Sequence, residues 1–212
     1  MLRRTVLATA VRLIIGASAS ALPAVAAADP ATFIDNLSTQ LRGLARNTSS
    51  QQRFAGFREL FRRNFDIPGL ARFIAGRFWR VFTPSEQQQF LGLFEDYVVF
   101  AYSDRLSDYA RNGDVLRVTS TRPEPAGVLV SSEITRGSRA WATRGTTVQP
   151  IKIDWRLTAR HGIYQISDVI IDGLSMAANG RSELEGVVER NGGRANAILA
   201  VMRQQIASAV VQ

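Results

Sequence analysis

The chain lacks cysteine altogether and contains a single histidine, His161. Without thiols it has no disulfide, no thiolate metal ligand and no thiol nucleophile. The lone histidine stands beside Gly162 in a predicted hairpin turn, where a solvated surface residue is more common than a catalytic base. A zinc site would need mainly carboxylate ligands, and no carboxylate pair at helical spacing accompanies the histidine. We therefore expect neither a bound metal nor a cofactor.

The familiar catalytic motifs are also missing. There is no Gly-x-Ser-x-Gly elbow, no phosphate-binding loop and no dinucleotide fingerprint. Asp168 and Asp172 flank an apolar stretch, and a partly buried aspartate in such a place more often caps backbone or pairs with an arginine than performs catalysis. The sequence therefore predicts a protein that is not an enzyme. A lipid or cell-wall enzyme that works through carboxylates alone is a rival interpretation.

Lysine is almost absent, since Lys152 is the only one among 26 basic residues. These outnumber the 18 acidic residues and give a formal net charge of +8. A GC-rich genome explains the arginine bias, and the arginines are not confined to one helix, so we do not expect nucleic-acid binding. A basic surface still suits anionic headgroups or an acidic partner. Arg72, Arg77 and Arg80 are candidates for either contact, with plain solvent exposure as the alternative.

Long apolar runs are absent except at the N-terminus. Two arginines there precede a run of small and apolar residues that ends at Ala28. This order is typical of a cleaved export signal, and Arg12 shortens the apolar stretch below a comfortable membrane span. We expect a signal peptide over residues 1–28, a single domain over residues 29–212 and a periplasmic location. An uncleaved N-terminal anchor is the alternative, and both the general and the twin-arginine export routes fit.

Four helices are predicted in the first half of the domain, because apolar residues recur there at helical spacing. They are expected from Pro30 to about Leu44, from Ser50 to Phe65, from Pro68 to Val81 and from Pro84 to Arg111. The last helix has the clearest start, since Thr83, Pro84 and Glu86 form a capping-box pattern. It also has a clear end, because Asn112-Gly113 is typical of a helix C-terminus.

The hydrophobic period then changes from that of a helix to that of a strand. Residues 151–158 alternate strictly between apolar and polar, which is typical of a strand with one buried face. Weaker alternation predicts three more strands, over residues 115–118, 128–134 and 163–171. Renewed helical spacing predicts two helices, over residues 175–190 and 194–210. The segments 122–127 and 137–145 are rich in turn-forming residues and are expected to be loops. Helices, a curved antiparallel sheet of about four strands and further helices make an α+β domain.

The chain carries eleven phenylalanines, several of them on the predicted helices between Ser50 and Arg111. Aromatic residues at helical spacing usually pack in a core. Here several helices are amphipathic, while the sheet offers only one buried face to meet them. The pattern fits either a filled core or an apolar cavity between helices and sheet.

Short motifs stand in a fixed order along most of the chain. They are Phe65-Asp66-Ile67-Pro68, Trp79-Arg80, Thr83-Pro84-Ser85-Glu86, Ile151-x-Ile-x-Trp-x-Leu157, Ser167-Asp168-Val169-Ile170-Ile171-Asp172-Gly173, Arg181-Ser182-Glu183-Leu184 and Asn191-Gly192-Gly193. Together with the export signal, they resemble the MlaC family of periplasmic lipid-binding proteins, also called the toluene-tolerance family. The resemblance extends from about Phe33 to Met202. The ending after Arg190 looks most like the branch associated with hopanoid biosynthesis.

The resemblance implies a lipid shuttle. Such a protein takes phospholipid or hopanoid from one membrane complex and delivers it to another, commonly an ABC transporter. It is expected to be a monomer that docks transiently and holds the acyl chains between helices and sheet. This chain departs from the family at Tyr164-Gln165, where Trp-Lys is common, and at Asn179-Gly180-Arg181, where Asn-Tyr-Arg is common. These departures leave the lipid's identity open, and a ligand-free periplasmic interaction module is the alternative function.

The expected lipid pocket follows from the apolar faces of the predicted elements and from family position. No catalytic or metal-binding residue is expected in it. The residues predicted to line it are Leu70, Phe73, Ile74, Phe78, Phe94, Val98, Tyr102, Ile153, Trp155 and Ile166.

Overall fold

The structure is a computed structural model that describes residues 29–45, 49–111, 114–135, 149–160 and 162–210. The predicted signal peptide, the predicted helix end at Asn112-Gly113, the predicted loop 137–145 and His161 lie outside these ranges. Helices α1 (Pro30–Ala45), α2 (Ser50–Asn64), α3 (Ile67–Ala75) and α4 (Pro84–Arg111) come first, with the 3₁₀ helix η1 (Gly76–Arg80) between α3 and α4. Strands β1 to β5 follow, over Val115–Glu124, Gly127–Thr135, Ile151–Arg160, Ile163–Ile171 and Leu174–Ser175. The chain then forms α5, Met176–Arg190, and α6, Ala197–Val210, so the predicted α+β class is confirmed.

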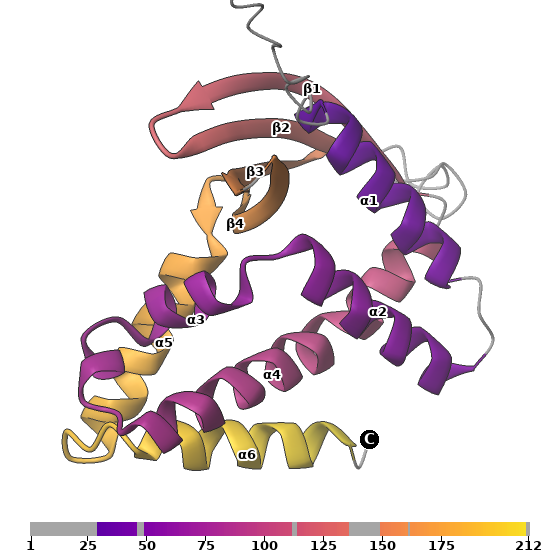
Figure 1. Ribbon diagram of the computed structural model, residues 1–212. Helices are drawn as coiled ribbons and strands as arrows, with labels where there is room; N and C mark the ends of the chain where they lie inside the picture. The colour runs from indigo at the N-terminus through magenta and orange to yellow at the C-terminus, as the bar shows by residue number, and fades with distance from the viewer. Residues whose placement is uncertain (1–28, 46–48, 112–113, 136–148, 161, 211–212) are drawn as a thin grey trace, which may run out of the picture.

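The sheet is an antiparallel meander in the order β1-β2-β3-β4-β5 (Figure 1). Strand β1 runs six residues beyond its predicted end at Val118, so the segment 122–127 is largely strand rather than loop. Pro123 is tolerated there because β1 is an edge strand, where a missing backbone donor is not needed. The hairpin requires glycine at position 127, since a Cβ would stand 1.9 Å from the Leu157 carbonyl oxygen.

The predicted helix from Pro68 to Val81 is wrong in its second half. Helix α3 ends at Ala75, and Gly76 takes a φ of +53°, which L side chains rarely adopt. A Cβ at Gly76 would also lie 2.6 Å from Nη2 of Arg181. The chain therefore turns at this glycine and continues as the 3₁₀ helix η1.

Helix α4 begins where it was predicted to begin because its capping box forms. The backbone N–H of Glu86 donates to Oγ1 of Thr83 over 3.2 Å, and the backbone N–H of Thr83 donates to Oε2 of Glu86 over 2.8 Å. These hydrogen bonds from Thr83 to the carboxylate lower the pKa of Glu86 below its ordinary value of 4.5. Two donors that a helix start would otherwise leave without partners are satisfied reciprocally.

We expect Thr83→Ala to lower the free energy of unfolding by about 1 kcal/mol, because Glu86 loses its backbone cap. Urea denaturation measures this loss. The matched control is Ser85→Ala, whose side chain accepts only from the exposed Gln89. A Thr83 variant as stable as the Ser85 variant would contradict the capping role.

The interior contains two apolar cores. One lies among α2 to α6 and includes Phe61, Leu70, Phe90, Phe94, Val188 and Ile198. The other lies between α1 and the sheet and includes Ile34, Leu37, Val130, Leu157 and Ile166. Figure 1 shows the same division, with α1 alongside β1 and β2 and the other helices below the sheet. Phe65 packs against both cores.

The junction between α2 and α3 ties the two parts together. Phe65 forms an isolated parallel bridge with Ile166 of β4, and the backbone N–H of Asp66 donates to the Ile166 carbonyl oxygen over 3.0 Å. The Asp66 carboxylate then accepts from the Gly69 N–H and caps α3. Helix α3 is thereby held at a fixed place under β4. In the part of the chain that the structure describes, no helix is both long and apolar enough to cross a bilayer.

Candidate functional site

A cavity of about 660 Å³ lies where the two cores meet. The helical core contributes Phe61, Leu70, Ile74, Phe90, Phe94 and Met202 to its wall. The sheet core contributes Leu37, Ile153 and Trp155. Native interiors hold few voids larger than a water molecule, whereas ligand pockets occupy about 300–1,000 Å³. The volume is therefore that of a ligand site rather than a packing defect.

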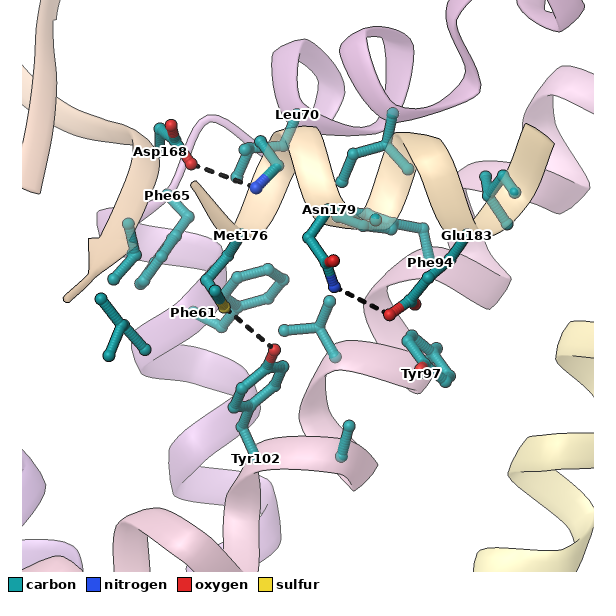
Figure 2. Close-up of a pocket in the computed structure, with 18 of the residues that line it drawn as sticks. Phe61, Phe65, Leu70, Phe94, Tyr97, Tyr102, Asp168, Met176, Asn179 and Glu183 are labelled. Atoms are coloured by element: carbon teal, nitrogen blue, oxygen red, sulfur yellow. Dashed lines mark hydrogen bonds between the residues drawn. The ribbon is translucent and has the colours of Figure 1, made fainter. Parts of the chain in front are cut away.

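Three polar side chains of the wall are exposed. Asn179 and Glu183 of α5 and Gln205 of α6 are all exposed, and Nδ2 of Asn179 donates to Oε1 of Glu183 over 2.8 Å. Figure 2 shows this pair beside Tyr97 of α4, while Phe61 and Phe65 lie on the opposite side. The site thus has an apolar interior and a polar rim. Among the described residues, no three His, Asp or Glu side chains are close enough to hold a metal ion.

Asp168 is the one buried carboxylate on the wall, with 5% of its surface exposed. One oxygen accepts from the Ala177 N–H over 3.1 Å, and the other accepts from Oγ of Ser175 over 2.7 Å and from Nη1 of Arg156 over 3.2 Å. Ser175 is the N-cap of α5. Asp168 therefore holds the start of α5 against β4 and pairs with an arginine, as the structural interpretation of the sequence predicted.

The family model of the MlaC protein matches residues 32–204 of this chain. The chain belongs to the MlaC family. No curated protein matches it in sequence. Among solved structures, it is similar to the phospholipid-binding protein from Ralstonia solanacearum, which was solved in complex with a phospholipid. The two are 18% identical, with a TM-score of 0.67 over 84% of this chain and 95% of that one, so this chain shares its fold.

Seven of the ten predicted pocket residues lie on the cavity wall. They are Leu70, Ile74, Phe94, Val98, Tyr102, Ile153 and Trp155. The other three are placed elsewhere. Phe73 is 48% exposed on the outer side of α3 under the Arg181 guanidinium, Phe78 packs within the helical core, and Ile166 is fully buried in the sheet core. The buried face of α3 is formed by Leu70, Ala71, Ile74 and Ala75 at helical spacing, and Phe73 lies outside it.

Several wall residues were missing from the sequence prediction. They include Leu37 of α1, Phe61 of α2, Phe65 between α2 and α3, Phe90 of α4, Val187 of α5 and Met202 of α6. Their helical spacing marks them as apolar-face residues. That spacing does not reveal whether an apolar face meets a neighbouring helix or an open cavity.

Gly180 is also on the cavity wall of this MlaC family member. It is the position where the resemblance pointed to a departure from the common tyrosine. A Cβ there would meet the Ile74 side chain at 3.6 Å, which is ordinary contact. A larger side chain would therefore project toward Ile74 and take up cavity volume that this chain leaves open.

The three arginines singled out in the sequence are exposed on α3 and η1. Arg72 lies over the Trp79 ring at 5.6 Å and Arg77 over the Phe78 ring at 5.0 Å. Both guanidinium groups are therefore held by aromatic faces on the outside of the helical layer. None of the three is on the cavity wall.

Proposed function

We propose that this protein is a phospholipid carrier whose cavity holds acyl chains while the headgroup stays at the polar rim. The observation that carries the proposal is the apolar cavity at the junction of two cores, open at a rim formed by Asn179, Glu183 and Gln205. Membership of the MlaC family supports it, as does the shared fold with a protein solved with a phospholipid. A cavity of this size favours a carrier over a ligand-free interaction module.

Simple energetics fit a shuttle. Each buried methylene gains about 0.8 kcal/mol, so two ordinary tails gain on the order of 20 kcal/mol, close to what a bilayer offers them. A carrier needs this near-balance, because a much tighter site would not release its cargo. The cavity wall offers a lipid few polar contacts that would hold it more tightly. Its buried carboxylate, Asp168, already accepts hydrogen bonds from protein donors.

The cellular setting is part of the same proposal. The carrier works in the periplasm and passes lipid between membrane complexes, including an ABC-type transporter, to which it docks transiently as a monomer. The exposed arginines Arg72, Arg77 and Arg80 suit an acidic docking partner, since they lie outside the cavity. The export-type N-terminal sequence supports this location. We assign the protein no catalytic step, and a hopanoid is the second candidate cargo.

Native mass spectrometry of the protein expressed with its N-terminal segment tests the proposal, followed by solvent extraction and lipid identification. We expect phospholipid in stoichiometric amount, and a hopanoid in its place would keep the carrier but change the cargo. An unliganded mass, with no uptake after incubation with phosphatidylglycerol vesicles, would overturn the carrier in favour of the interaction module.

A further inference from the structure

A second, smaller cavity of about 110 Å³ lies between α1 and strands β1 to β3. Ile34, Leu116 and Ile134 line it but not the main cavity. Ser38 also lines it and is bonded within the protein, and the atoms that the wall exposes are all apolar, so a hydrogen-bonding ligand would find no partner there. The chemistry of the wall suits an aliphatic group alone.

The two cavities share a wall. Leu37 and Leu41 of α1 and Ile153 and Trp155 of β3 line both of them. The smaller cavity is therefore reached from the larger by passing these four side chains. It lies on the α1 side of the molecule, away from the polar rim that α5 and α6 form.

The two halves of this wall differ in how firmly they are held. Nε1 of Trp155 donates to Oγ of Ser132 over 2.9 Å, and that hydroxyl donates to the Ile153 carbonyl oxygen over 3.0 Å. These buried hydrogen bonds fix the indole. Leu41 is only half-buried on α1 and makes apolar contacts, so a rotamer change moves it without breaking a hydrogen bond. Passage between the cavities is thus expected on the α1 side of the wall.

We infer that the second cavity receives the methyl end of an acyl chain whose remaining length lies in the main cavity, and that it sets which chain lengths the protein carries. This inference rests on the proposed function, since it concerns the same lipid. A methylene takes up about as much room as a water molecule in the liquid, about 30 Å³. The second cavity therefore adds space for roughly three or four methylenes. A methylene that does not fit into the cavities stays in water and loses about 0.8 kcal/mol of burial, which lowers the affinity for that lipid about fourfold.

The first test narrows the second cavity and leaves the main one intact. Leu116→Phe places a ring in it from β1, and Ile134→Phe does so from the paired position on β2. The matched control is Val115→Phe, one residue away on the opposite face of β1 and 49% exposed. Each protein is incubated with vesicles of phosphatidylglycerol in which shorter and longer saturated chains are equally abundant, and the bound lipid is analysed by mass spectrometry.

We expect Leu116→Phe and Ile134→Phe to bind phosphatidylglycerol in stoichiometric amount, with the ratio of the longest to the shortest chains lowered about fourfold, because each ring takes up about one methylene more room than the side chain it replaces. The Val115 variant should keep the wild-type ratio. An unchanged ratio in two folded, loaded filling variants would overturn the inference and leave the carrier proposal standing. No lipid in the wild-type protein would instead be a failure of the carrier proposal itself.

A second test needs no substitution. The wild-type protein is loaded with phosphatidylglycerol carrying a photoreactive diazirine at the last carbon of one chain, irradiated and digested. Labelled peptides should contain Ile34, Leu116 or Ile134. Labels found only on α2 to α6 would place the methyl end within the helical side of the main cavity and contradict the inference.

Discussion

Replacing Val98 with tryptophan is expected to reduce the phospholipid that copurifies with the protein about tenfold. Val98 is half-buried on α4, and its side chain lines the cavity together with Phe94 and Tyr102. An indole in its place projects into volume that an acyl chain would occupy. Displacing about two methylenes costs about 1.6 kcal/mol of burial, which is slightly more than a factor of ten in affinity. The bound lipid is quantified by native mass spectrometry.

The control for this experiment is the same substitution at an exposed site. Val81 is 68% exposed between η1 and α4 and does not line the cavity. Val81→Trp should load as much lipid as the wild type. Undiminished lipid in a folded Val98→Trp protein would show that the acyl chains lie elsewhere.

Removing the carboxylate of Asp168 is expected to lower the free energy of unfolding by about 1–3 kcal/mol. Asp168→Ala takes away the hydrogen-bond acceptor of the buried Ala177 N–H and of the Ser175 hydroxyl at the start of α5. Leaving these two donors without this partner costs about 1–3 kcal/mol. Arg156 keeps its ion pair with Glu124, whose Oε2 lies 2.9 Å from Nε of Arg156, so the loss of its Asp168 contact adds little to the destabilisation.

Urea denaturation measures the loss, and Asp168→Asn should lose less because its amide oxygen still accepts one hydrogen bond. Asp35→Ala, on the exposed face of α1, is the matched control and should change stability by no more than about 0.5 kcal/mol. An Asp168→Ala protein as stable as the control would contradict the capping role. A folded variant that also lost lipid would point to a direct role for the carboxylate in the cavity.

Local sequence was sufficient to predict the elements that are fixed by contacts between residues close in the chain or by a strict apolar–polar period. The start of helix α4 was predicted correctly because Thr83 and Glu86 cap it through contacts three residues apart. Strand β3 was found from strict alternation, since a sheet with one buried face imposes that period. The helix through Gly76 was predicted wrongly, because helical spacing does not reveal that Gly76 adopts a φ of +53° and lies close to Arg181, more than a hundred residues later.

The sequence by itself determined the α+β class, the apolar surplus of the helices and the absence of thiol chemistry. Only the tertiary structure decided which apolar side chains face a cavity. Phe73 and Ile74 are equally apolar neighbours, yet one lies outside and the other on the wall. The physical reason is that burial of an apolar face lowers the free energy whatever it packs against. Periodicity therefore shows that a face is buried, and only the meeting of α1, the sheet and α2 to α6 leaves part of that buried surface uncovered.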